Sequence, residues 1–124
     1  GSRFIDKDID GFKSSTTRRI GIKIISFFIK FATGKRVFDT TSGFRAVNKE
    51  IIYDFSLSYP NEYPEPLTTA ELLKKNYKFK EVAVKMKERT GGVSSIKAWK
   101  SIYYMLNVSL ALIAIKIRRY KRCQ

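Results

Sequence analysis

The stretch from Arg18 to Thr33 constrains the fold of this chain more than any other feature. After Arg18 it is apolar except for one narrow polar stripe, whose members recur every three or four residues: Arg19, Lys23, Ser26, Lys30 and Thr33. That spacing predicts an α-helix over 18–33, with Thr17 as its N-cap and Gly34 at its end. A helix with so wide an apolar surface is either deeply packed or lies in a membrane interface.

A second apolar helix is predicted near the end of the chain, from Ser95 to about Arg119. Its central run, Ile102–Ile115, is shorter than the roughly 20 residues needed to span a bilayer. Aromatic residues lie at one end and bases at the other: Trp99, Tyr103 and Tyr104, then Arg118, Arg119, Lys121 and Arg122. Aromatic and basic residues at the ends of an apolar helix are typical of the lipid interface.

The segments between these helices predict a mixed α/β chain. The expected elements are a short strand at Gly43–Val47, a helix from the N-cap Asn48 to about Phe55, a helix at Thr68–Lys75 closed by Asn76, and a strand at Tyr77–Met86. Tyr59–Pro66 is expected to be irregular, because proline is excluded from a helix interior.

The charge balance is strongly basic: 25 Lys and Arg against 11 Asp and Glu give a net charge of +14 in 124 residues. Such a surface attracts polyanions, namely nucleic acid, anionic lipid head groups or nucleotide phosphates. The chain has no histidine, so proton transfer near neutral pH falls to carboxylates, cysteine or lysine. Cys123 is the single cysteine, which excludes an internal disulfide framework and a cysteine zinc site.

Two polar clusters are candidates for binding phosphate. The first, Asp39–Arg45, combines an acid, three hydroxyl residues, a glycine and an arginine. The second, Arg89–Ser95, could cradle a phosphate on backbone N–H groups, with Arg89 as a charged clamp. Each cluster also fits a plain surface turn. In the first, Asp39 would then cap the turn and Gly43 would supply a positive φ angle.

Carboxylates supply the remaining candidates. Glu65 is held between two prolines, and with histidine absent, Glu65 and Asp39 are the best candidates for a general base. A rigid surface loop is the alternative for Glu65. Asp6–Asp10 matches the opening of a calcium loop and an Asp-x-Asp pattern, but Thr17 stands where the calcium loop requires glutamate. A solvated acidic turn is favoured there, and the chain contains no complete nucleotide-binding motif.

Taken in order, these segments resemble the C-terminal half of an inverting family-2 glycosyltransferase of the GT-A type. The chain is similar to dolichyl-phosphate mannose synthases and to bacterial polyprenyl-phosphate or polysaccharide glycosyltransferases. The resemblance rests on Gly1–Phe4, Asp39–Ala46, Tyr63–Pro66, Glu81–Met86, Arg89–Ile96 and Ser101–Met105, and it spans nearly the whole chain. The family often has proline where this chain has Ala83, a departure that affects strand geometry.

The resemblance implies a fold: the C-terminal part of a nucleotide-diphospho-sugar transferase αβα sandwich, with amphipathic helices and a few strands. Residues 1–94 would form the acceptor-side half of the catalytic domain, and residues 95–124 an apolar, membrane-proximal helix with a basic tail. The half that binds the nucleotide sugar and carries the metal-binding Asp-x-Asp would lie outside this chain. Mg²⁺ or Mn²⁺ would therefore serve the full-length enzyme, and no metal is expected on the residues of this chain.

Carried over by position, the resemblance also implies roles for individual residues. Asp39 and Glu65 would line the catalytic centre, and one of them would deprotonate the acceptor. The residues expected to bind substrate or phosphate are Arg3, Ser42, Gly43, Arg45, Arg89, Gly92 and Ser94. Of these, Arg3 and Arg89 would contact phosphate, whereas the residues of the Asp39–Arg45 loop would shape the acceptor site.

Two functions from different classes remain open. In the first, the chain is part of a glycosyltransferase that moves a sugar from a nucleotide-sugar donor to a lipid phosphate or growing cell-surface glycan. It would act at the cytoplasmic face of the membrane, and these residues alone would be inactive. In the second, it is a small basic module that binds a membrane or nucleic acid, although its apolar stripes are broad for a nucleic-acid face. A half-sandwich exposes sheet edges and helix faces, so homo-oligomers are also expected.

Overall fold

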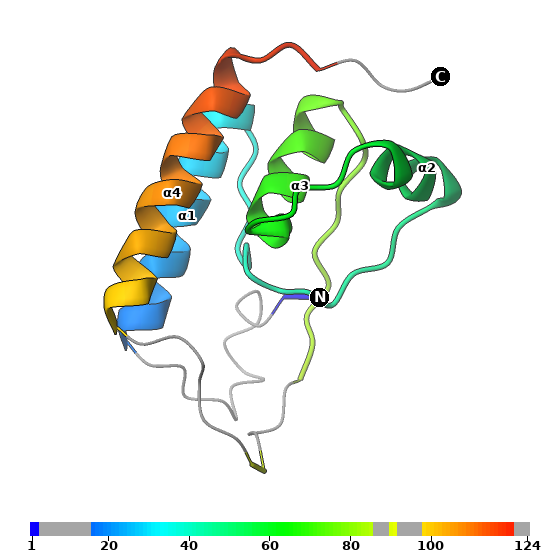
Figure 1. Ribbon diagram of the computed structural model, residues 1–124. Helices are drawn as coiled ribbons and strands as arrows, with labels where there is room; N and C mark the ends of the chain where they lie inside the picture. Colours follow the sequence, from blue (N-terminus) through cyan, green and yellow to red (C-terminus); the bar gives the residue numbers. More distant parts are fainter. Residues whose placement is uncertain (3–15, 86–89, 92–97, 121–124) are drawn as a thin grey trace.

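The computed structural model describes residues 1–2, 16–85, 90–91 and 98–120, and these residues form four helices and no strand. The helices are α1 (Thr16–Thr33), α2 (Lys49–Leu57), α3 (Pro64–Lys74) and α4 (Ala98–Ile117), as Figure 1 shows. The prediction of an α/β chain, the C-terminal part of an αβα sandwich with strands at Gly43–Val47 and Tyr77–Met86, is therefore wrong for the described residues.

The segment Tyr77–Lys85 runs beside the helices without becoming part of a sheet (Figure 1). Ser2 donates its N–H to the Val82 carbonyl at 2.7 Å and accepts from the Val84 N–H at 3.0 Å, which makes one isolated parallel bridge. A strand requires a neighbour that continues such bonds along several residues. Because Val82 is 58% exposed, its side chain also lacks the cover that a packed sheet would give it.

The segment Gly43–Val47 forms no ladder either, because backbone groups of Phe44 bond elsewhere. The Phe44 N–H donates to Ser42 Oγ at 3.4 Å, and the Phe44 carbonyl accepts from the Gly1 nitrogen at 2.5 Å. This segment is therefore a loop tied to the beginning of the described chain.

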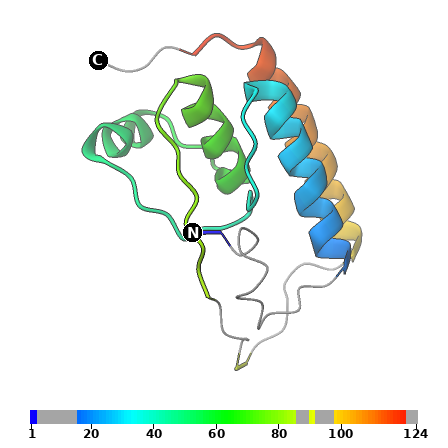
Figure 2. The same cartoon turned by 180° about the vertical axis from the view of Figure 1, so that it is seen from behind.

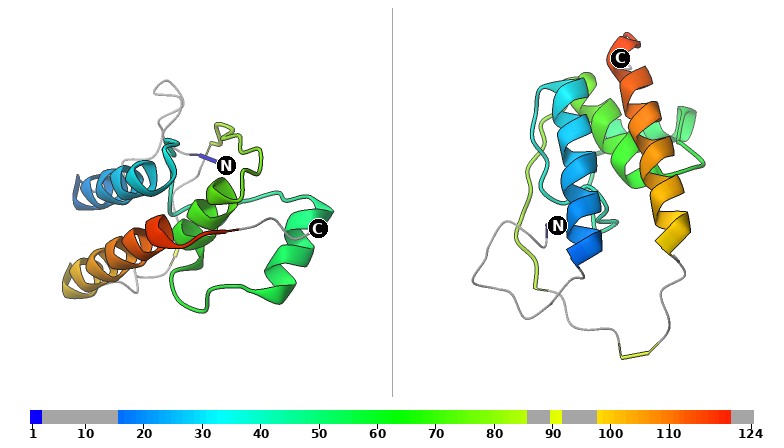
Figure 3. Two further views of the ribbon diagram at one scale, coloured as in Figure 1. Left: turned by 90° about the horizontal axis from the view of Figure 1, so that it is seen from above. Right: turned by 90° about the vertical axis from the view of Figure 1, so that its left-hand side faces the viewer.

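α1 and α4 lie side by side and run in the same direction, as the opposite views of Figures 1 and 2 show. α3 packs against both of them, which Figure 3 shows from above. These three helices share one buried core with Val37, which follows α1 in the chain. The core residues are Ile25, Ile29, Val37, Ala70, Leu73, Val108, Leu112 and Ile115. Gly21 lies where α4 approaches, since a Cβ at this position would be 3.3 Å from Met105 Sδ. The inner faces of α1 and α4 are thus deeply packed.

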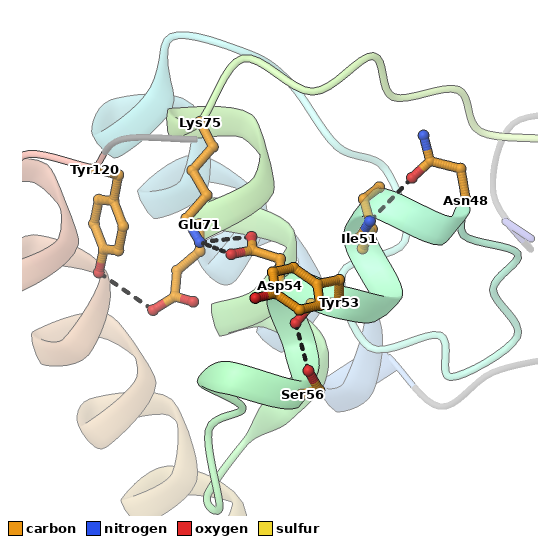
Figure 4. Close-up of polar contacts among 8 residues, drawn as sticks. All are labelled: Asn48, Ile51, Tyr53, Asp54, Ser56, Glu71, Lys75 and Tyr120. Atoms are coloured by element: carbon orange, nitrogen blue, oxygen red, sulfur yellow. Dashed lines mark hydrogen bonds and ion pairs between the residues drawn. The ribbon is translucent and has the colours of Figure 1, made fainter. Parts of the chain in front are cut away.

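The helix ends follow the local sequence with one exception. Asn48 caps α2 as predicted, because its side chain accepts the Ile51 N–H at 3.1 Å (Figure 4). Gly34 ends α1 as predicted, with a φ angle of +75° and its N–H donated to the Lys30 carbonyl at 2.7 Å. Thr17 is the exception, since it lies inside α1 and does not cap it.

α3 begins earlier than the sequence predicts. The segment Tyr59–Pro66 is not irregular throughout, because α3 starts at Pro64 and has both Pro64 and Pro66 in its first turn. Proline is tolerated there, since the first N–H groups of a helix have no partner within it. Tyr63, the residue directly before the helix, has a left-handed backbone conformation with a φ angle of 52°. Asn76, with a φ angle of 60°, follows its end as expected.

α2 lies on the far side of α3 from α1 and α4 (Figure 3). A second, small apolar cluster holds it, formed by Ile51, Phe55, Leu72 and Tyr77. Beside this cluster, Lys75 Nζ donates to both carboxylate oxygens of Asp54 at 2.7 and 2.6 Å (Figure 4). This ion pair joins α2 to the end of α3.

α1 and α4 each carry a second apolar face, which is exposed and lies opposite the buried one. We call it the outer face: Trp99, Ile102, Tyr103, Leu106, Leu110, Ile113 and Ile117 on α4, with Ile20, Phe27 and Phe31 on α1. Lys116 of α4 holds its Nζ 3.4 Å from the centre of the Phe31 ring, which links the two helices. The helix from Trp99 to Ile117 is 19 residues long and, by length and composition, could cross a membrane.

Candidate functional site

The Asp39–Arg45 loop folds against the first turn of α3, and Arg45 holds the two together. Its Nε donates to the Ser42 carbonyl at 3.2 Å, its Nη2 to the Glu65 carbonyl at 2.6 Å and its Nη1 to Thr68 Oγ1 at 2.6 Å. Because the donors of a guanidinium group lie in one rigid plane, these bonds fix the angle between the loop and the helix.

Burial lowers the pKa of the Arg45 guanidinium from its ordinary value, and the nearby Glu65 and Tyr59 oppose this shift. An arginine side chain nevertheless stays protonated in proteins. The loop therefore keeps a positive charge at Arg45. The hydrogen bonds of the guanidinium group hold the loop to α3.

The turn of the loop is at Thr40 and Thr41, and Ser42 and Gly43 follow it. Ser42 is buried, and its Oγ accepts the Phe44 N–H. Gly43 has no positive φ angle, because Gly34 is the one described glycine that has one. The interpretation of Gly43 as a positive-φ turn residue is therefore wrong. A Cβ at Gly43 would lie 3.9 Å from Glu65 Oε1, so the glycine lies beside a predicted catalytic carboxylate.

Asp39 lies at the other end of the loop and is only 7% exposed. Its N–H donates to Glu81 Oε1 at 2.9 Å, and the neighbouring Phe38 N–H donates to both Glu81 oxygens at 3.1 and 2.9 Å. The Glu81 carboxylate thus joins the loop to the segment Tyr77–Lys85.

A pocket of about 130 Å³ lies between the loop, α2, α3 and the segment Tyr77–Lys85. Its polar and charged lining residues are Ser42, Thr69, Tyr77, the acids Asp39 and Glu81, and the bases Arg45, Lys78 and Lys80. With three cations and two anions, the lining carries a net positive charge. Pockets that enclose a whole small ligand measure roughly 300–1,000 Å³. A pocket of this volume therefore holds one small chemical group.

Glu65 lies in the first turn of α3, where the helix dipole favours a carboxylate. It does not line the pocket, so the two predicted catalytic carboxylates occupy different places. Glu65 is near Tyr104 of α4, whose ring meets the Tyr63 ring edge to face at 4.7 Å. Burial, followed by the charge of Glu65 and by Tyr63, raises the pKa of Tyr104 to about 12. The Tyr104 phenol is therefore neutral near pH 7.

No sequence pattern assigns a role to Glu81, to Thr68 or to the lysines at 78 and 80, although the structure brings them to the site. Glu81 bonds to N–H groups 42 and 43 positions earlier in the chain. Thr68 meets an arginine 23 positions earlier. The one local signal was the alternation of charged and apolar side chains after Tyr77, which indicates a surface but not what lies across from it.

The other predicted phosphate-binding residues lie outside the described part of the chain: Arg3, Arg89, Gly92 and Ser94. The acidic stretch Asp6–Asp10 also lies outside it. Within the described ranges, no group of three or more His, Cys, Asp or Glu side chains is placed to hold a metal ion. The Mg²⁺ or Mn²⁺ expected for the full-length enzyme, with ligands mainly outside this chain, stays a prediction.

Comparison of the chain with protein-family models, with curated proteins and with solved structures gives no match. The function must therefore be inferred from the chemistry of the pocket and the helices.

Proposed function

We propose that this chain supplies the acceptor-binding side of an inverting glycosyltransferase that acts on a lipid-linked phosphate at a membrane surface. The observation that carries this proposal is the small, basic pocket beside the buried Asp39 carboxylate. A phosphate group fits its size, and Arg45, Lys78 and Lys80 are cations among its lining residues. The outer face of α1 and α4 offers the apolar surface that a lipid-bound acceptor requires.

In such a transfer, an acceptor oxygen forms a bond to the anomeric carbon of the donor sugar. At the same time, the bond between that carbon and the diphosphate oxygen of the nucleotide breaks, and the configuration at the carbon inverts. Where the acceptor oxygen carries a proton, a carboxylate must take it. Asp39 lines the pocket and is the first candidate, with Glu65 second. Glu81 instead holds the loop, because its oxygens accept backbone N–H groups of Phe38 and Asp39.

We place α4 along the membrane surface and not across the membrane. Its inner face packs against α1 and α3 through Val108, Leu112 and Ile115. Crossing would carry α3 into the hydrocarbon together with Glu71 and Lys74. Each charged side chain at the bilayer centre costs roughly 2.5–3.5 kcal/mol on insertion scales. At the interface these charges stay in water, and Arg118 and Arg119 lie within reach of anionic head groups.

Sugar transfer by the native protein tests the proposal. The native protein, with whatever precedes Gly1, is expected to transfer a labelled sugar from one of a panel of nucleotide sugars to a polyprenyl phosphate in vesicles. The product should have the opposite anomeric configuration to the donor. Residues 1–124 alone should transfer none, because the donor-binding half is expected outside them. Transfer by residues 1–124, or no transfer by the native protein with any donor, would contradict the proposal.

Changing Leu106 and Leu110 together to lysine is expected to weaken binding to lipid vesicles at least tenfold. The two leucines are 61% and 65% exposed, so the fold does not depend on burying them. A leucine that becomes fully buried contributes roughly 1.5–3 kcal/mol. Flotation with vesicles that contain anionic lipid measures the effect. Both changes add positive charge, so weaker attraction to the lipid head groups cannot explain a loss.

Ile52→Lys is the matched control, because Ile52 is 58% exposed but belongs to α2 and not to the outer face. This variant should float like the wild type. Retention of RNA at the same salt concentration, without flotation, would instead favour the basic nucleic-acid-binding module.

A further inference from the structure

We infer that Glu81 is a positioning residue that fixes the backbone of the Asp39 loop and thereby directs the Asp39 carboxylate to the pocket. The catalytic role of Glu81 rests on the proposed function, whereas its hydrogen bonds to the loop do not depend on that function. Glu81 accepts the N–H groups of two consecutive residues, Phe38 and Asp39, at 2.9–3.1 Å. A carboxylate that accepts two successive backbone N–H groups leaves the peptide between them little freedom.

The segment that carries Glu81 is itself held on both sides. Beyond Glu81, Val82 and Val84 bond to Ser2 at 2.7 and 3.0 Å. Before it, the Tyr77 N–H donates at 3.0 Å to a carbonyl of α3. Ser2 and Tyr77 are 1% and 4% exposed, so both attachments are buried. The backbone that carries the Glu81 side chain is therefore held in place.

The far end of the same loop is held by Arg45, which bonds to Ser42 and to the first turn of α3. The loop is thus held at one end by an anion and at the other by a cation. Asp39 lies directly at the anionic end. A catalytic group that is held in its productive position before substrate arrives loses little entropy in the reaction.

The charge of Glu81 matters as well as its shape. Hydrogen bonds to an ionised acceptor are roughly twice as strong as neutral ones. Glu81→Gln keeps the size of the side chain and one acceptor oxygen but removes the charge. The loop should then remain folded but open more often, which moves Asp39 away from its place in the pocket.

Amide hydrogen exchange in residues 1–124 is the first part of the test. In Glu81→Gln, exchange at the Phe38 and Asp39 N–H groups should become roughly ten- to hundredfold faster. The Ile51 N–H, which bonds to Asn48, reports whether the fold is retained and should not change. The second part is sugar transfer by the native protein. There, kcat should fall at least tenfold with an unchanged KM for the nucleotide sugar.

Glu62→Gln is the matched control, because Glu62 is exposed and has no hydrogen bond or ion pair among the described residues. Unchanged exchange at Phe38 and Asp39 in Glu81→Gln would overturn the inference, whatever the transfer assay gives. Faster exchange with a wild-type kcat would overturn it too, since Asp39 would then not depend on the loop. A wild-type native protein that transfers no sugar refutes the proposed function and with it the catalytic role. The exchange rates then decide alone whether Glu81 holds the loop.

Discussion

With an acceptor that attacks through a hydroxyl group, replacing Asp39 by asparagine in the native protein should reduce sugar transfer by roughly 10²–10⁴-fold, the range expected when a general base is lost. Asparagine has nearly the same size as aspartate but cannot take a proton from the acceptor. The Asp39 N–H bond to Glu81 is a backbone bond, so the substitution leaves it in place. The loss should appear in kcat, measured with saturating nucleotide sugar, while the melting temperature stays within a few degrees of the wild type.

The variant Glu65→Gln shows how much the second candidate carboxylate contributes to sugar transfer compared with Asp39. We expect a smaller loss, because Glu65 does not line the pocket. Glu62→Gln, at an exposed position, should have no effect and controls for a general loss of negative charge. If Asp39→Asn kept the wild-type kcat while Glu65→Gln abolished transfer, the pocket beside Asp39 would not be the place of proton removal.

Asp54→Ala should destabilise the protein by roughly 3–5 kcal/mol. The Lys75 side chain is 12% exposed and that of Asp54 only 4%, so removing the acid leaves a buried ammonium group without its partner. Native domains are stable by only about 5–15 kcal/mol, so the loss would be a large part of the total. Urea unfolding followed by circular dichroism measures it. The N–H groups of α2 should exchange first, because this helix is held by the ion pair and one small apolar cluster.

The double variant Asp54→Ala with Lys75→Met separates the buried charge from the lost contact. With no charge left to bury, most of the stability should return. Glu62→Ala, at an exposed acidic position, should change stability by less than about 0.5 kcal/mol. A loss in the double variant as large as in Asp54→Ala would show that packing around Asp54, and not the unpaired lysine, causes the effect.

The helices were largely predictable because their signals are local. The polar stripe of α1 recurs every three or four residues, and Gly34 ends the helix with its positive φ angle. Asn48 bonds to an N–H only three positions ahead. The start of α3 at Pro64 was not predicted, because proline has two opposite effects on a helix. It is excluded from the interior but suited to the first turn. Choosing between them depends on where the helix begins, which Pro64 alone does not determine.

The candidate site was predictable only in part. The Asp39–Arg45 loop was found from its composition, and the structure places Asp39, Ser42 and Arg45 around one pocket. The bonds that shape the loop were not predictable. Arg45 meets α3 across 20 and 23 positions of sequence, and Glu81 meets the loop across 42 and 43. Nothing near Glu81 in the sequence indicates which N–H groups lie across from it.

The sequence by itself determined the features that depend on near neighbours: the apolar faces of α1 and α4, the cap of α2, the basic charge, and the acid, hydroxyl and arginine composition of the Asp39–Arg45 loop. Only the tertiary structure decided whether an extended segment becomes a strand. Alternating side chains favour an extended backbone, but a sheet exists only where a second segment continues the hydrogen bonds. Among the described residues, the segment Tyr77–Lys85 meets only Ser2 in this way. The same dependence on distant partners makes Glu81 and Arg45 the residues that fix the site.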